Sequence, residues 1–205
     1  MAKHVDDRQL NELLCQALET EIGGIQVYEN ALACAINDDL RNEFNEYLAQ
    51  TKRHREVLLS VCKQLGLDPK TQTPGRQVVE HLGASLVKAI QLARNGGDPV
   101  AAELFACECV VIAETKDHLN WELIGQVGKN LTGTTAQVLM RAYEEIEDQE
   151  DQHLYHSKGW ARELWIDSLG LPAVLPPPED VKRVDTAIAA ARAEQGREGM
   201  LKKGH

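Results

Sequence analysis

Apolar residues recur every three or four positions over most of the chain, the spacing that places side chains on one face of an α-helix. Four long stretches have this pattern, at about residues 7–36, 40–65, 99–128 and 134–168. No segment combines the two-residue alternation of a strand with strong β-branched enrichment. The pattern therefore predicts an all-α fold built on four long helices.

Proline and glycine separate these helices unevenly. Short breaks at 37–39 and 132–135 join the first helix to the second and the third to the fourth. The connection between the two pairs is long, and it contains a shorter apolar helix near 77–94. Two short loops and one long crossover predict a four-helix bundle of two hairpins.

The segment GLPAVLPPP follows the fourth helix, and its prolines cannot continue a helix. We therefore expect a bundle domain over 1–170, followed over 171–205 by a proline-rich linker and a C-terminal helical arm. The arm is predicted to contain an alanine-rich helix near 179–195. We expect this helix to dock on a partner protomer.

Polar residues interrupt the apolar stripe of every long helix. Burying a carboxylate or an imidazole without a partner costs about 2–7 kcal/mol or more, so each interruption calls for a polar partner or a metal. The two halves of the chain form a weak internal repeat, because each has a glutamate seven residues before an aromatic residue. The repeat indicates that the polar residues lie at similar depths in the bundle. The interrupting residues are Glu21, Thr51, His54, Glu114, His118, Glu150 and His153.

These residue types are the ligands that Fe(II) and Mn(II) prefer, carboxylate oxygen together with imidazole nitrogen. In EDQH, residues 150–153, the glutamate and the histidine are three apart and project from one side of a helix. A bundle core that holds two such ions takes one glutamate from each of two helices and a Glu-x-x-His pair from each of the others.

Over residues 8–168 the chain resembles the ferritin-like diiron-carboxylate family, which includes bacterioferritin and rubrerythrin. The resemblance rests on the first-helix glutamate with Tyr28, on one carboxylate or imidazole from each later helix, and on the EDQH motif. It implies a ferritin-like four-helix bundle that holds iron, as a dinuclear centre, or manganese, with redox chemistry on O2 or peroxide. It also implies that one glutamate bridges the ions and that the histidines are terminal ligands. The metal ligands so implied are Glu21, His54, Glu114, Glu150 (the bridge) and His153.

One residue departs from the family pattern. Three positions before His54 the family has a glutamate, where this chain has Thr51. Gln50 is adjacent but is offset by about 100° around the helix, and His118 is an extra nitrogen that could compensate. The site is therefore a mononuclear centre, a pair with a weakly held second ion, a differently bridged pair, or a degenerate site without metal. A degenerate site would make the protein a structural or adaptor bundle, and a substrate hydroxylase of the same fold is a third alternative.

Other polar and aromatic residues are assigned structural roles. His118 is expected to be a satisfied polar residue or a partner of a ligand rather than a ligand. His156 falls off the apolar stripe and is expected on the surface. Tyr28 and Trp121 are expected to be core aromatics.

Composition and charge limit the binding partners and the cellular compartment that the sequence predicts. The net charge of −10 gives the 205-residue chain no basic stripe for nucleic acid, and no apolar run is long enough to span a membrane. Five cysteines without a CxxC pair predict free thiols and a cytoplasmic location. Without a rubredoxin-like cysteine site, electrons would come from a donor protein or from Fe(II) itself. We expect a homodimer or a larger homo-oligomer.

Overall fold

The structure of the chain is a computed structural model that describes residues 5–201. Within this range every regular element is a helix, so the all-α prediction is confirmed. The helices are α1 (Asp7–Leu32), α2 (Asp38–Leu65), α3 (Pro74–Asn95), α4 (Pro99–Asn130), α5 (Thr134–Ser168), α6 (Pro178–Val181) and α7 (Ala187–Leu201).

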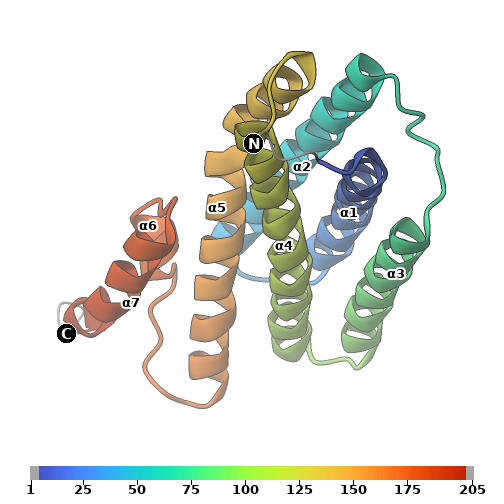
Figure 1. The fold of residues 1–205 in the computed structure, drawn as a ribbon. Coiled ribbons are helices and arrows are strands. Elements are labelled where there is room, and N and C mark those ends of the chain that lie inside the picture. The colour runs from blue at the N-terminus through green and yellow to red at the C-terminus, as the bar shows by residue number, and fades with distance from the viewer. Residues whose placement is uncertain (1–4, 202–205) are drawn as a thin grey trace.

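Two helical hairpins form the bundle. Short connections make α1 antiparallel to α2 and α4 antiparallel to α5, and α1 packs on α4 while α2 packs on α5. The crossover helix α3 lies outside this group against α1 and α4, on the opposite side of the molecule from α6 and α7 (Figure 1). The predicted order of two hairpins and one crossover helix is therefore confirmed.

The first helix ends at Leu32, four residues earlier than the sequence predicts. The Glu103 carboxylate at the start of α4 accepts hydrogen bonds from the amides of Ile36 and Asn37, at 2.7 and 2.6 Å. Asn37 then caps α2 with its own side chain. A contact with a distant segment thus holds these residues out of the helix.

The crossover is fixed at its first turn. Thr73 caps α3, and the Arg76 guanidinium binds the Glu19 carboxylate of α1 at 2.8 Å. Further along, Gly23 and Gly83 allow α1 and α3 to approach closely, because a Cβ on Gly83 would lie 3.4 Å from the backbone of Gly23.

The apolar core is divided into two clusters along the bundle axis. One is built around Tyr28, Phe44 and Trp160, and the other around Leu58, Trp121 and Ile146. The polar residues that interrupt the four stripes lie between the two clusters. The fold therefore brings those residues to one depth, in the middle of the bundle.

The C-terminal arm runs back along α5 of its own chain. Figure 1 shows α6 and α7 beside α5. Arg162 of α5 binds Glu179, and Arg197 of α7 binds Glu163 of α5. Docking of the arm on a partner protomer stays a prediction.

The single helix expected near 179–195 is interrupted. Helix α6 ends at Val181 and α7 begins only at Ala187. Between them Arg183 has a positive φ of 49°, and the neighbouring Val184 is buried. The Val184 carbonyl accepts a hydrogen bond from His156 of α5, so packing against the bundle favours the break.

None of the helices within residues 5–201 combines the length and the apolar character needed to cross a membrane.

Candidate metal centre

The five side chains that the sequence singles out as ligands lie together between the two apolar clusters. Each is at most 2% exposed, so neither carboxylate nor imidazole is solvated by bulk water. They come from four helices: Glu21 from α1, His54 from α2, Glu114 from α4, and Glu150 and His153 from α5.

The two imidazoles present the same atom to the centre. The His54 Nδ1 lies 2.8 Å from Glu150 Oε1, and the His153 Nδ1 lies 3.4 Å from Glu114 Oε2 and 3.8 Å from Glu150 Oε1. The rings stack with their centroids 5.4 Å apart. Both Nδ1 atoms therefore face carboxylate oxygens.

The outer nitrogens are held by two glutamines. His54 Nε2 is 2.8 Å from Gln149 Oε1, and His153 Nε2 is 2.6 Å from Gln50 Oε1. Because the amide oxygens accept hydrogen bonds, this arrangement places the ring hydrogens on Nε2 and leaves lone pairs on Nδ1. A lone pair that faces a carboxylate oxygen needs a cation between them, which is either a proton or a metal ion.

Gln50 was expected to face away from the centre, and that expectation is wrong for its side chain. Its backbone position is off the stripe, but the long side chain reaches back to His153. Gln149, likewise one residue before a stripe position, does the same for His54.

Asp117 is a further carboxylate of the centre, which the Glu-x-x-His pattern does not predict. It is 4% exposed and lies on α4 three residues after Glu114, so both project from one side of the helix. Oxygens of Glu21, Asp117 and Glu150 lie within 4.8 Å of one another. A search for Glu-x-x-Asp as well as Glu-x-x-His on each stripe would have found it.

Two ligand triads thus share one residue. The first consists of His54, Glu150 and His153, whose ligand atoms lie within 4.8 Å of one another, and the second is the carboxylate triad with Asp117. Glu150 belongs to both. The geometry offers two neighbouring positions for a cation, joined by one carboxylate.

The centre has an excess of negative charge. Within residues 5–201 no lysine or arginine nitrogen lies within 4.0 Å of its four carboxylates. The basic partners that Glu21, Glu114 and Glu150 do have there are the imidazoles of His54 and His153. Burial and neighbouring carboxylates raise the pKa of Glu21 and of Asp117 well above the usual range, and burial with Glu114 raises the pKa of Glu150 to about 8. Burial also lowers the pKa of His54. Without a cation, the site therefore favours neutral carboxyl groups.

Several polar atoms of the centre have no hydrogen-bond partner in the described part of the chain. Buried polar atoms are almost always hydrogen-bonded in proteins, so such a group at one place indicates a ligand. Trp121 Nε1 donates to Glu21 Oε1 at 2.9 Å and leaves Oε2 free. The unpartnered atoms are Glu21 Oε2, Tyr28 Oη, His54 Nδ1, Glu114 Oε2, Asp117 Oδ1, both oxygens of Glu150, and His153 Nδ1.

Thr51 lies in the core but does not supply a free ligand. Its hydroxyl donates to the Tyr47 carbonyl at 2.8 Å, within α2. Its methyl carbon lies 3.4 Å from the position that a Cβ on Gly24 would take. Thr51 is therefore a packing residue at the boundary of the centre.

An open cavity reaches the centre from one side. It has a volume of about 210 Å³ and lies between α4, α5 and the start of α7. Glu150 and Trp121 line it on the bundle side, and Thr186 and Ala187 line it on the arm side. A small molecule could thus approach Glu150 between the bundle and the arm.

Two other histidines lie outside the centre. His118 is bound to Asp151 at 2.6 Å, the expected satisfied polar role. His156 is only 4% exposed, so the expectation of a surface position is wrong. Tyr47 on α2 and Val184 in the arm cover it, and neither could be inferred from the stripe on α5.

No family model, curated protein or solved structure matches the chain.

Proposed function

We propose that the protein binds two iron or manganese ions in the core of a ferritin-like bundle and carries out redox chemistry with O2 or peroxide there. The observation that carries the proposal is the pair of ligand triads that share Glu150. Four carboxylates and two imidazoles match the donor preference of both metals. Such ions would supply electron transfer to O2 or peroxide when bound.

We infer that Asp117 replaces the carboxylate that is missing at Thr51. The chain lacks a carboxylate three residues before His54, but it has an additional one three residues after Glu114. The total of four carboxylates and two imidazoles equals the set that a two-ion bundle site uses. We therefore favour a differently bridged pair over a single ion or an empty site.

The surrounding residues have defined tasks in this proposal. Gln50 and Gln149 hold the imidazole Nε2–H groups, so that Nδ1 is aimed inward as a ligand. Tyr28, whose buried hydroxyl has no hydrogen-bond partner within residues 5–201, lies against His153 with the ring centroids 6.2 Å apart. The apolar clusters on both sides exclude water, and the cavity beside Glu150 would admit a small oxidant. An electron-donor protein, a cytoplasmic location and a homo-oligomer remain part of the proposal.

Metal content per chain tests the proposal. Metal-free protein is loaded with Fe(II) without O2, or with Mn(II), and bound ions are counted by mass spectrometry. Since each outer ligand serves one triad, we expect His153→Ala and Asp117→Asn each to bind one ion fewer than the parent. Asp151→Asn, which removes an aspartate outside the triads, is the matched control and should keep the full count. Loaded parent should then consume O2 or peroxide.

An adaptor bundle with a degenerate site is the second candidate. The observation that favours it is Thr51, which replaces a ligand of the family pattern and whose hydroxyl donates to the Tyr47 carbonyl. A parent that binds no core metal, together with variants that fold equally well, would support this candidate and reject the first.

A further inference from the structure

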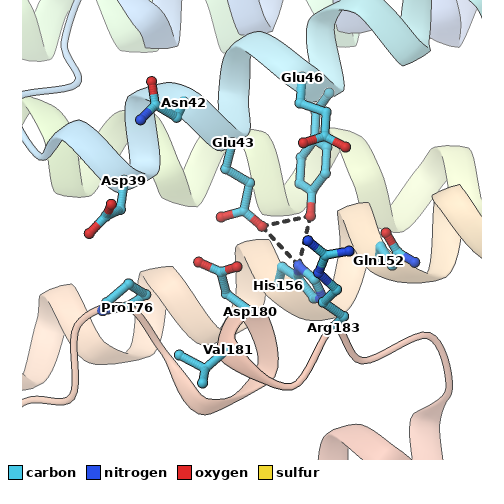
Figure 2. A pocket seen from close by; sticks show the side chains of 11 residues that line it. Asp39, Asn42, Glu43, Glu46, Gln152, His156, Pro176, Asp180, Val181 and Arg183 are labelled. Atoms are coloured by element: carbon cyan, nitrogen blue, oxygen red, sulfur yellow. Dashed lines mark hydrogen bonds and ion pairs between the residues drawn. The ribbon is translucent and has the colours of Figure 1, made fainter.

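A second group of ligand-type side chains lies outside the centre, where the arm meets the bundle. Glu43 of α2, His156 of α5 and Asp180 of α6 converge at the inner end of an open polar cavity of about 530 Å³ (Figure 2). Their ligand atoms lie within 4.8 Å of one another. The group uses none of the residues of the two triads.

The hydrogen bonds of His156 fix which nitrogen faces this cavity. Its Nε2 lies 3.1 Å from the Val184 carbonyl oxygen, which can only accept, so Nε2 bears the hydrogen. In the neutral ring Nδ1 then carries the lone pair, 2.9 Å from Glu43 Oε1 (Figure 2) and 2.8 Å from the Tyr47 hydroxyl. The imidazole has the orientation of a metal ligand whose other nitrogen is anchored on the backbone.

With a neutral His156, a single hydrogen is shared between two acceptors at this point. The Tyr47 hydroxyl is also 2.6 Å from Glu43 Oε1, but its single hydrogen can serve either that oxygen or His156 Nδ1. When the imidazole is neutral, the 2.9 Å contact between Glu43 Oε1 and His156 Nδ1 therefore has no hydrogen of its own. A cation between the two atoms would complete both.

The two carboxylates are placed to ligate. Trp160 Nε1 donates to Glu43 Oε2, which turns Oε1 toward His156. Asp180 approaches from the arm, near the same point (Figure 2). Two ligands of a tetrahedral Zn²⁺ ion, at about 2.0–2.2 Å from it, are about 3.3 Å apart. The three ligand atoms lie within 4.8 Å of one another, so side-chain movements of about 1.5 Å at most let them share an ion.

We propose that Glu43, His156 and Asp180 form a divalent-metal site, with Zn²⁺ as the ion that their one-nitrogen, two-oxygen donor set suits. Three protein ligands and an open polar cavity leave a fourth position for water or another small ligand. Because Asp180 belongs to α6 and the other two ligands to the bundle, the bound ion ties the arm to α2 and α5. The site is independent of the core centre.

Zinc binding to the full-length protein tests this site. Metal-free parent and variants are titrated with Zn²⁺ alone, and bound ions per chain are counted. We expect Asp180→Asn to bind one ion fewer than the parent, and His156→Ala to do the same. Asp39→Asn is the matched control, because Asp39 lines the same cavity and loses the same charge without being one of the three ligands.

Hydrogen exchange of the arm supplies a readout that the core centre does not control. Zn²⁺ should slow amide exchange over residues 178–184 in the parent, in Asp39→Asn and in His153→Ala, but not in Asp180→Asn. Equal zinc counts in the parent, Asp180→Asn and His156→Ala would overturn the proposal and leave a proton on His156 as the occupant. Loss of core ions in His153→Ala with the arm still protected by Zn²⁺ would separate the two sites.

Discussion

Glu150 and Glu163 are buried carboxylates on the same helix, yet their surroundings are opposite. Glu163, which is 0% exposed, accepts hydrogen bonds from Arg197 at 2.7 Å, from the Val174 amide at 2.8 Å and from Arg162 at 3.0 Å. Glu150, which is 1% exposed, accepts none from the described residues. Neither side chain is open to solvent, and the partners of the two carboxylates differ.

The pKa values of the two groups follow these partners. Burial and the Glu114 carboxylate raise the pKa of Glu150 to about 8, although His153 opposes the shift. Burial alone would raise the pKa of Glu163 as well, but Arg197, the Val174 amide and Arg162 together lower it. Breaking the contacts of a buried carboxylate that the chain itself satisfies destabilises the fold, whereas a carboxylate that the chain leaves open is available to an external cation.

The largest effect that separates the two residues is on stability without metal. Glu163→Gln should lower the free energy of unfolding by about 2–3 kcal/mol, because it leaves Arg162 and Arg197 without their shared anion. Glu150→Gln should instead raise it by about 1–3 kcal/mol, because it removes a buried ionisable group that has no partner. Urea unfolding of protein treated with a chelator measures both.

The same pair should diverge in metal binding. Glu150→Gln is expected to bind two core ions fewer than the parent, since both triads need it, and Glu163→Gln is expected to bind as many as the parent. If Glu150→Gln is less stable than the parent without metal, the Glu150 carboxylate makes a stabilising contact within the protein, and the prediction is wrong.

The next effect concerns pH, again without metal. The folded state keeps the Glu150 proton up to about pH 8, while the unfolded chain loses it near pH 4.5, so stability falls as the pH rises through this window. The slope is about 1.4 kcal/mol per pH unit for one proton, and Glu21 and Asp117 add to it. Glu163 acts in the opposite sense: its contribution is present above pH 4.5 and is lost in more acidic solution.

Unfolding curves from pH 3.5 to 9 separate these contributions. Glu150→Gln should flatten the loss between pH 4.5 and 8, and Glu163→Gln should flatten the loss at acid pH. Saturation of the parent with Mn(II) should remove the first loss too, because the ion takes the place of the protons. A parent that gains stability from pH 5 to 8 without metal contradicts this account.

Helix periodicity was enough to predict the all-α bundle and five of the side chains that lie between its two apolar clusters. Glu21, His54 and Glu150 each lie on a stripe whose other members are apolar, and such a stripe is buried whatever the neighbouring helices are. Asp117 was missed although its signal was local, because only histidine was sought three residues after a glutamate. The helix face was predicted correctly, and only the type of ligand sought on it was too narrow.

Other parts of the structure could not be predicted from any one helix. His156 is buried because Tyr47 of α2 and Val184 of the arm cover it, and these contacts join residues far apart in sequence. The early end of α1 depends on Glu103 in the same way. Long side chains are a further source of error: Gln50 is off its stripe by backbone position but reaches the centre with its amide.

The smallest effect is expected at Gln50 and Gln149. The groups that contact Glu150 are held differently from those that contact Glu163. Glu163 is held directly by arginines, whereas the imidazoles that face Glu150 and Glu114 are held through Nε2 by Gln149 and Gln50. Gln149→Leu or Gln50→Leu removes the acceptor that fixes the ring hydrogen, and metal affinity should weaken about 10- to 100-fold. Competition with a chelator of known affinity measures this, with Gln152→Leu on the same helix as the control. Unchanged metal affinity in both variants would mean that the glutamines do not hold Nδ1 in position to bind metal.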